Sequence, residues 1–230
     1  MPGVENCLIE ATDLFHGLTP EQINQVKGWL YCRNYPAGTH IITAQQPGEV
    51  VYIIQSGSVK IYIEQASGAE VILAILGPGD IVGEMSLIDS SGRSASVVTL
   101  EESRLLWMGA GAFQECLHTI PVFAQNLVRI LAARVRLANE LIQALAALDV
   151  NGRVARQMLA FADKYGHTSP NGETLIPIRL TQGDVADLVG ASRKRVNQAM
   201  VLFKGQGYIS VNEKGQITVH NRKALAQYCR

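Results

Sequence analysis

The stretch GEMSLIDSSGRSASVV, residues 83–98, contains four residues that could together bind an anion. Gly83 allows a ligand to approach the backbone closely, and the residues after it could begin a short helix whose free N–H groups favour a phosphate. Arg93 supplies a planar, permanent positive charge for the same phosphate. Glu84 can accept a hydrogen bond from a ligand hydroxyl, and Ser94 offers a hydroxyl or a backbone donor. A structural Glu–Arg salt bridge that closes a loop is the alternative interpretation.

A second group of polar residues lies in LTQGDVADLVGASRKRVNQAM. Thr181, followed at the third position by Asp184, predicts a capped helix start. That helix ends at Gly190, and Ser192 can cap a second helix over residues 193–204. Two helices joined by a glycine-containing turn predict a helix-turn-helix.

The second of these helices is expected to have one buried and one polar face. We expect its buried face to contain Val196, Ala199, Met200 and Phe203. The polar residues of its first turns are where a recognition helix contacts base edges in the major groove. The residues assigned to DNA are Thr181, Gln182, Ser192, Arg193, Lys194, Arg195, Asn197, Gln198 and Lys214. A helical hairpin with a solvated basic face is the alternative.

The segment YISVNEKGQITVH predicts a hairpin beside the recognition helix, with its turn at residues 213–215. Such a wing places Lys214 near the DNA backbone. Arg195, Arg222 and Lys223 are further candidates for phosphate contacts, which position a protein on DNA without specifying sequence.

The net charge of zero hides a division between the two parts of the chain. Residues 1–150 carry 8 Lys and Arg against 15 Asp and Glu, whereas residues 151–230 carry 12 against 5. The first part therefore has a charge of −7 and the second a charge of +7. An acidic module and a basic module have different partners, and the basic one is a candidate for nucleic-acid binding.

The acidic part is expected to be rich in short strands. Residues 9–33 are predicted to be helical, with an entry at Thr19 and Pro20. After them come the β-branched segments THIITA, EVVYIIQ, SVKIYIEQ, EVILAIL and SASVVTL, separated by turns built on Gly or Pro. Many short strands with this punctuation predict a compact β-barrel or β-roll.

A long helix is predicted to follow from Pro121, because no Pro or Gly interrupts the chain until Gly152. One apolar stripe repeats by three and four and is expected to pair with a second copy of the helix. The residues assigned to this dimer interface are Val128, Leu131, Val135, Ala138, Ile142 and Leu145. A second stripe can pack on the β-domain. The alternative is a helix wholly buried in a monomer.

Several classes of function are disfavoured by composition. The four cysteines are scattered, with no C-x-x-C pair, so we expect no metal site, iron–sulfur cluster or disulfide framework. No apolar run is long enough for a membrane span, and the N-terminus lacks a secretory signal, which indicates a cytoplasmic protein. The five histidines are dispersed, and no Ser–His–Asp set or pair of catalytic carboxylates converges, so no enzyme activity is expected.

The motifs together resemble a known family. G-E-M-S-L followed by R-S-A-S-V, preceded by GPGDIV, resembles the phosphate-binding cassette of cyclic-nucleotide-binding domains. With the long helix, ALDVNGRVARQML and VGASRKRVNQAM, the match covers nearly the whole chain. The chain is similar to bacterial transcription regulators of the cyclic AMP receptor protein and fumarate–nitrate regulator superfamily. This implies an α+β fold with a cyclic-nucleotide-binding β-roll domain at 1–119, a dimerisation helix at 120–149 and a winged helix-turn-helix DNA-binding domain at 150–230.

The resemblance also implies roles for individual residues. The cassette's glycine, glutamate, arginine and serine match the family's phosphate and ribose contacts. Arg134 matches a long-helix arginine that can pair with Glu84. The residues assigned to the nucleotide are Ile61, Leu73, Val82, Gly83, Glu84, Met85, Arg93, Ser94, Ala95, Arg134 and Asn139.

The identity of the nucleotide depends on two adjacent positions of the long helix, which normally approach the adenine, one from each subunit. Here they are Ala138 and Asn139. Asn139 could bond a base edge, but Ala138 has no hydroxyl, and a lost hydrogen bond of this kind costs about 0.5–1.5 kcal/mol. Cyclic AMP is the expected effector. Cyclic GMP, cyclic di-GMP and action without a ligand are the alternatives; haem is disfavoured because no histidine falls in or near the cassette.

The recognition helix departs from one branch of the family. Members that resemble the enteric cyclic AMP receptor carry R-E-x-x-x-R there, whereas this chain keeps Arg193 and has Lys194 and Gln198 at the other two positions. A lysine cannot accept from a cytosine amino group, and a glutamine suits adenine better than guanine. We therefore expect a homodimer on double-stranded DNA with two-fold symmetric half-sites that differ from the enteric ones. RNA polymerase is a further expected partner.

Overall fold

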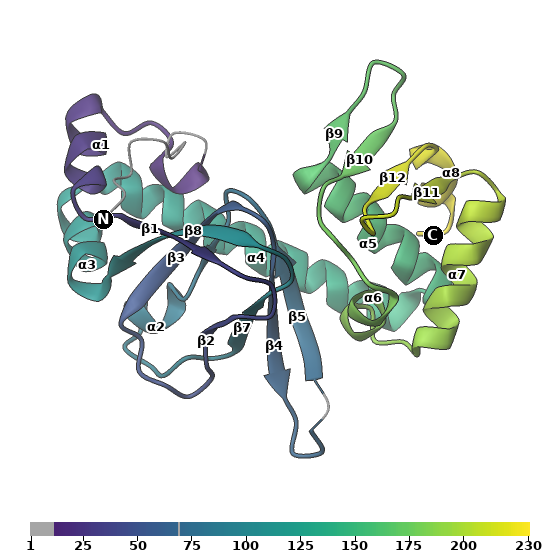
Figure 1. The fold of residues 1–230 in the computed structure, drawn as a ribbon, viewed down its shortest axis with the longest axis horizontal. Helices are drawn as coiled ribbons and strands as arrows, with labels where there is room; N and C mark the ends of the chain where they lie inside the picture. Colours follow the sequence, from purple (N-terminus) through teal and green to yellow (C-terminus); the bar gives the residue numbers. More distant parts are fainter. Residues whose placement is uncertain (1–11, 69) are drawn as a thin grey trace. The chain divides into compact units, whose positions relative to one another are not determined.

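The computed structural model describes residues 12–68 and 70–230, and its fold is drawn in Figure 1. The chain forms two compact units. The first runs to Ile63 and resumes from Leu73 to Val135, and the second comprises Glu64–Ile72 and Arg136–Arg230. The α+β architecture expected from the sequence is confirmed: a β-roll, a long helix and a helix-turn-helix follow one another along the chain.

Two four-stranded sheets make up the β-roll, with strand orders β1-β8-β3-β6 and β2-β7-β4-β5. On β3, Ile53 is paired with Leu106 of β8, and both side chains are fully buried. Because a one-residue slip would turn such side chains to solvent, their burial sets the register of the strands. The strands are β1 (Tyr31–Tyr35), β2 (His40–Ile42), β3 (Val50–Ser56), β4 (Val59–Glu64), β5 (Glu70–Leu76), β6 (Ile81–Val82), β7 (Ser96–Thr99) and β8 (Ser103–Gly109).

Helices cover one face of the first sheet and form the larger hydrophobic core with it. They are α1 (Pro20–Lys27), α2 (Met85–Ile88), α3 (Ala110–Thr119) and α4 (Pro121–Ala147). Phe123 of α4 lies at the centre of an aromatic cluster, 6.0 Å from Phe15 and 5.7 Å from Phe113 between ring centroids. All three rings are buried, and burying a phenylalanine contributes roughly 1.5–3 kcal/mol.

A second, smaller core fills the space between the two sheets. Ile42 and Val97 enter it from one sheet, and Ile54 and Leu105 from the other. Val82, the last residue of β6, also belongs to this core. The chain segment that begins at the next residue is therefore held at the edge of a packed interior.

The predicted helix over residues 9–33 is partly wrong. Residues 9–11 lie outside the described part of the chain, and α1 is confirmed with the expected cap, since Thr19 and Gln22 bond each other's backbone N–H groups. The chain then enters β1 at Tyr31. This strand pairs with β8, and the Tyr31 ring stacks on Trp107 at 4.5 Å, so tertiary pairing overrides the local helical pattern.

The long helix is confirmed as α4, which begins at Pro121 as expected and ends at Ala147. Its predicted heptad stripe is mostly exposed: Val128, Val135 and Ile142 are 60–64% accessible, and Leu145 is 47% accessible. Leu131 is the exception, because it is half-buried against the larger core. The exposed stripe contradicts a helix that is wholly buried within one chain.

The second unit combines helices α5 to α8 and the C-terminal part of α4 with a four-stranded sheet of order β11-β12-β10-β9. Asp149 caps α5, its side chain accepting from the N–H of Gly152 at 2.8 Å. The elements are α5 (Val150–Tyr165), β9 (His167–Thr168), β10 (Thr174–Ile176), α6 (Gln182–Leu188), α7 (Arg193–Gly205), β11 (Ile209–Val211), β12 (Ile217–Val219) and α8 (Arg222–Gln227).

The wing is confirmed, because β11 and β12 pair as an antiparallel hairpin around the predicted turn. The segment HTSPNGET contains a second short hairpin: β9 and β10 pair there, and Thr168 and Thr174 lie opposite each other with their hydroxyls 3.2 Å apart. Helix α8 was not predicted. It is capped by Asn221, which accepts from the N–H of Ala224 at 3.0 Å.

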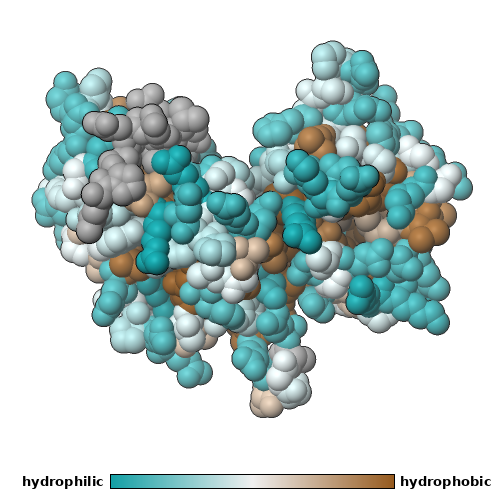
Figure 2. Space-filling model, viewed as in Figure 1, coloured by the Kyte–Doolittle hydropathy of each residue, from teal (hydrophilic) through white to brown (hydrophobic). Residues whose placement is uncertain are grey.

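The visible surface in Figure 2 is largely hydrophilic, with smaller hydrophobic areas over both units. Within the described ranges, no single helix is long and apolar enough to cross a membrane. Helices α3 and α4 satisfy the length and composition of a span only when taken together, as a pair bent by 107°.

Candidate functional site

The candidate ligand site begins at Gly83, directly after β6. Its φ of +86° is a conformation that glycine adopts without strain. A Cβ at this position would lie 2.6 Å from Nη1 of Arg93 and 3.1 Å from the carbonyl oxygen of Val50. Glycine is therefore needed both for the backbone turn and for the space that Arg93 occupies. The short helix expected after Gly83 is present as α2 (Met85–Ile88).

The Arg93 side chain is directed into the protein and is only 7% exposed. Its guanidinium donates to three uncharged oxygens: the carbonyl of Gly83 at 2.7 Å, Oγ of Ser86 at 2.9 Å and the carbonyl of Val50 at 2.6 Å. Burial lowers the pKa of Arg93 from its usual value, while Tyr52 and Glu84 act in the opposite direction. The structure thus holds a cation whose hydrogen-bond partners carry no charge.

Glu84 is the second buried charge of the site, with 1% of its surface exposed. Its Oε1 accepts from Nη1 of Arg134 at 2.6 Å, which is the pairing that the family resemblance implies. Arg134 also donates to the carbonyl of Ile81. The second carboxylate oxygen, Oε2, is buried and has no hydrogen-bond partner. A buried, unpartnered oxygen is costly unless a ligand supplies a donor.

The other residues of the first unit that were assigned to the nucleotide differ in their exposure. Ala95 and Val82 are buried, and Ile61 is half-buried against the core between the sheets. Leu73 and Met85 are 45% and 51% exposed, and Ser94 is also exposed.

Asn139 and Ala138 are exposed positions of α4. They belong to the second unit, whereas the cassette belongs to the first.

The candidate nucleic-acid site is built on α6 and α7 of the second unit. Thr181 and Asp184 form the predicted capping box of α6, and the Ser192 side chain accepts from the N–H of Arg195 to cap α7. The predicted buried face of α7 is confirmed, since Val196, Ala199, Met200 and Phe203 are all at most 5% exposed. The polar residues on the other side are exposed: Arg193, Lys194, Arg195, Asn197 and Gln198.

Three contacts in this unit could not be read from the sequence. Nε2 of Gln182 donates to Oδ1 of Asn197 at 2.9 Å, which ties the first turn of α6 to α7. Arg153 of α5 donates to the carbonyl oxygens of Val189 and Gly190 in the turn between them. Arg222, one of the candidate phosphate contacts, is instead paired with Asp163.

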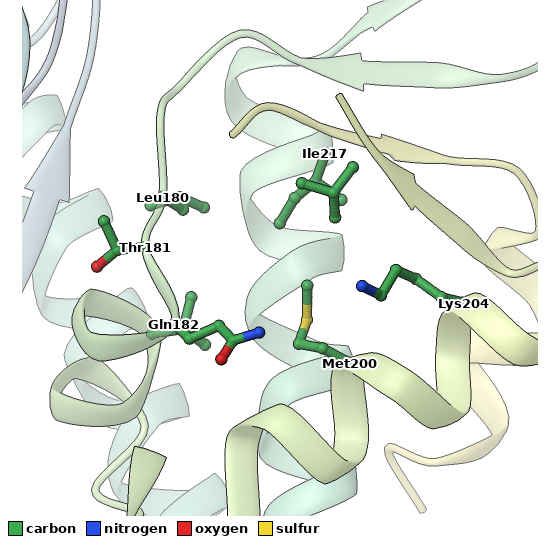
Figure 3. Close-up of a pocket in the computed structure, with 8 residues that line it drawn as sticks. Leu180, Thr181, Gln182, Met200, Lys204 and Ile217 are labelled. Carbon is green, nitrogen blue, oxygen red and sulfur yellow. The ribbon is translucent and has the colours of Figure 1, made fainter. Parts of the chain in front are cut away.

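A small cavity of about 80 Å³ lies beside the start of α6. Figure 3 shows Met200 and Lys204 on α7 facing Leu180 and Gln182 across it, with Ile217 of β12 closing one side. Sites for cofactor-sized ligands usually measure about 300–1,000 Å³. This cavity is therefore too small for a nucleotide.

No group of three or more His, Cys, Asp or Glu side chains that could hold a metal ion occurs in the described part of the chain. Cys116 is fully buried, and burial raises the pKa of its thiol to about 11. Since the thiolate is the reactive form, Cys116 is a core residue rather than a redox or metal-binding group.

Comparison with known proteins assigns both sites to the same family. Residues 32–119 match the cyclic nucleotide-binding domain, and residues 152–228 match the Crp-like helix-turn-helix domain. The chain is 34% identical to the CRP-like cAMP-activated global transcriptional regulator of Mycobacterium tuberculosis, over 97% of this chain and 99% of that protein. The chain belongs to the CRP/FNR family of transcription regulators.

One further relative agrees with this assignment, and one solved structure shares the fold. The cyclic AMP receptor protein of Thermus thermophilus is 31% identical over 94% of this chain and 95% of its own length. The structure of FixK2 from Bradyrhizobium japonicum superposes with a TM-score of 0.76 at 20% identity, covering 87% of this chain and 98% of that one, and so shares the fold. As a CRP/FNR protein, the chain is a DNA-binding regulator with a cyclic nucleotide-binding domain.

Replacing Arg134 with alanine should lower the free energy of unfolding of the first unit by about 2–3 kcal/mol, because Glu84 would remain as a buried, unpaired charge. The effect should stay at the lower end of the range for buried pairs, because the Arg134 side chain is 26% exposed. Adding Glu84→Gln should recover about 1 kcal/mol, since the charge is then gone. Urea unfolding followed by the fluorescence of Trp29 and Trp107, both in the first unit, measures these changes.

The control is Arg136→Ala, which removes an exposed arginine from the same helix and should change the stability by less than about 0.5 kcal/mol. Equal effects of the Arg134 and Arg136 substitutions would contradict the importance of the buried pair.

Proposed function

We propose that this protein is a homodimeric, sequence-specific transcription regulator of the cytoplasm, controlled allosterically by a cyclic nucleotide, with cyclic AMP as the effector. In this proposal residues 1–119 bind the nucleotide, residues 120–149 form the dimer helix and residues 150–230 bind DNA. RNA polymerase is the further partner through which such a regulator acts.

The observation that carries the proposal is the combination of charges in the cassette. Arg93 offers a buried guanidinium whose present partners are uncharged, and Glu84 offers a buried oxygen, Oε2, without a partner. A cyclic nucleotide supplies an anionic phosphodiester for the first and a ribose hydroxyl for the second. A simple inorganic anion would satisfy Arg93 but would bring no hydroxyl donor to Glu84.

The choice of cyclic AMP rests on relatives and on Asn139. The Mycobacterium tuberculosis relative is cAMP-activated by its name, and it aligns over 97% of this chain. Asn139 is exposed on α4 and can both donate to and accept from a base edge. Ala138 has no side-chain group that can bond a base edge. We therefore expect the protein to distinguish poorly between different bases, but to distinguish well between cyclic nucleotides and molecules that lack the phosphate. Cyclic GMP and cyclic di-GMP are the alternative effectors.

The dimer is supported by the exposed stripe of α4. Val128, Val135, Ile142 and Leu145 repeat at the spacing of a helix that packs against another helix, and all four are at least 47% exposed in the single chain. An apolar stripe of this length on the surface of a soluble protein marks an interaction site. A second copy of α4 offers the complementary stripe by symmetry.

Binding of ligand should be coupled to binding of DNA in both directions. If cyclic AMP tightens operator binding by some factor, the operator must tighten cyclic AMP binding by the same factor. The nucleotide can produce this coupling only if it binds the dimer arrangement that is competent for DNA more tightly than the arrangement that is not.

Calorimetry should show binding of cyclic AMP to the wild-type protein, and Arg93→Leu should weaken it by about 50-fold or more because charged hydrogen bonds to the phosphate are lost. Arg33→Leu is the matched control, since Arg33 is an exposed arginine of the same unit. Titrations with cyclic GMP and cyclic di-GMP test the alternatives. Unchanged binding in Arg93→Leu would overturn the assignment of the cassette.

Sedimentation equilibrium should give twice the 25.0 kDa mass of the chain. Val135→Glu and Ile142→Glu each place a charge in the proposed interface and should shift the protein toward the monomer. Ile63→Glu, at a β4 position that is 41% exposed, should leave the dimer intact. A monomeric wild-type protein, or dimers unaffected by both helix substitutions, would contradict the proposed interface.

Operators selected from a random DNA library should be two-fold symmetric and should differ from the enteric half-sites where Lys194 and Gln198 contact the bases. The double variant Lys194→Glu, Gln198→Arg should move the base preference toward the enteric operator, each altered contact changing it by about 1–3 kcal/mol. Lys214→Ala should instead weaken binding to all sequences and reduce the salt slope by about one. If the wild type and the double variant select the same bases, the prediction that Lys194 and Gln198 of α7 contact the bases is wrong.

A further inference from the structure

The side chain of Ser86 lies inside the cassette, between Gly83 and Arg93. Its Oγ accepts from Nη1 of Arg93 at 2.9 Å and donates to the carbonyl oxygen of Gly83 at 3.3 Å. Nη1 of Arg93 also donates to that carbonyl, at 2.7 Å. The three groups therefore form a closed triangle, and Ser86 is only 6% exposed.

The position of this hydroxyl is restricted by its surroundings. Gly48 lies so close that a Cβ there would come within 2.4 Å of the Ser86 Oγ and 2.8 Å of its Cβ. Ser86 also belongs to α2, whose backbone is anchored by the N–H of Leu87 donating to the carbonyl of Glu84 at 3.0 Å. The Ser86 side chain is therefore packed directly against the backbone of Gly48, on a helical turn that is itself hydrogen-bonded.

Ser86 differs in kind from the other acceptors of Arg93. Gly83 and Val50 bind the guanidinium through main-chain carbonyls, which any residue would provide. The main chain of Arg93 itself is held at both ends, since its N–H donates to Gln46 and its carbonyl accepts from Gln45. With the backbone fixed, the Ser86 hydroxyl is the side-chain group that determines where Nη1 lies.

We propose that Ser86 is a positioning residue for ligand binding: its hydroxyl holds the Arg93 guanidinium in the place where it meets the phosphate of the cyclic nucleotide. This inference rests on the proposed function of the cassette and gives a role to a residue of the motif that the sequence analysis did not assign to the nucleotide. Without the hydroxyl, Nη1 keeps one acceptor, and the guanidinium must be ordered again at the moment of binding, which weakens the complex.

Calorimetry with cyclic AMP tests this on the full-length protein. Ser86→Ala should raise the dissociation constant about tenfold, the value expected for the loss of one hydrogen bond to a charged group. In an Arg93→Leu background the same substitution should have less than about a twofold further effect, because its action passes through the guanidinium. Ser58→Ala is the matched control: Ser58 is fully buried in the same unit and donates to Glu101 at 2.7 Å, away from the cassette.

Two calorimetric outcomes would overturn the inference. The first is that Ser86→Ala binds cyclic AMP as tightly as the wild type and Ser58→Ala do. The second is that Ser86→Ala raises the dissociation constant by the same factor in the Arg93→Leu background as in the wild type. Such persistence would mean that Ser86 acts by supporting the fold rather than by placing Arg93.

A readout without ligand separates this inference from the proposed function. Solution NMR of arginine-labelled protein should show slowly rotating Nη groups for Arg93 in the wild type, assigned by their absence in Arg93→Leu. These signals should broaden or shift in Ser86→Ala and remain in Ser58→Ala. If the wild type binds no cyclic nucleotide, the proposed function fails, and the NMR comparison still decides the role of Ser86. Unchanged Arg93 signals in Ser86→Ala would refute it.

Discussion

Arg93 is only 7% exposed, and its guanidinium must have fixed hydrogen-bond acceptors, because a buried charge without them costs several kcal/mol. One acceptor of Arg93, the carbonyl of Val50 on β3, is far along the chain from the other two, Gly83 directly after β6 and Ser86 on α2. These elements must therefore meet at one point before the charge can be buried. The cassette is in this sense a product of the completed β-roll, and its local motif alone could not form it.

The same requirement extends to the long helix through Glu84. One oxygen of this carboxylate is bound by Arg134 of α4, and the other is left free of protein partners. A hydroxyl donor at the second oxygen would act on a group that is already attached to α4. The exposed stripe lies on the same helix. The Glu84 carboxylate therefore links the proposed ligand site to the proposed dimer surface directly, through its hydrogen bond with Arg134 of α4.

The sequence allowed the α+β fold, the cassette motif, the start of α4 and all four buried residues of α7 to be predicted, because each depends on local spacing or on glycine, proline and capping side chains. It could not show β1, whose partner β8 is distant in the chain, or the β9–β10 hairpin, which is short and polar. The contribution of Val50 was also invisible, because it acts through a carbonyl that every residue has. The pairing of Gln182 with Asn197 requires knowledge of how α6 and α7 pack.

The cap at Asp149 has a consequence for how the chain is divided into cooperative parts. Helix α4 ends at Ala147 and α5 begins at Val150, so the backbone hydrogen-bond ladder is interrupted there and is started again by one carboxylate. Helices that do not share a ladder can fray and reform separately. At this junction α4 and α5 are therefore connected by side chains rather than by a shared backbone ladder, as in the ion pair between Glu140 of α4 and Arg156 of α5.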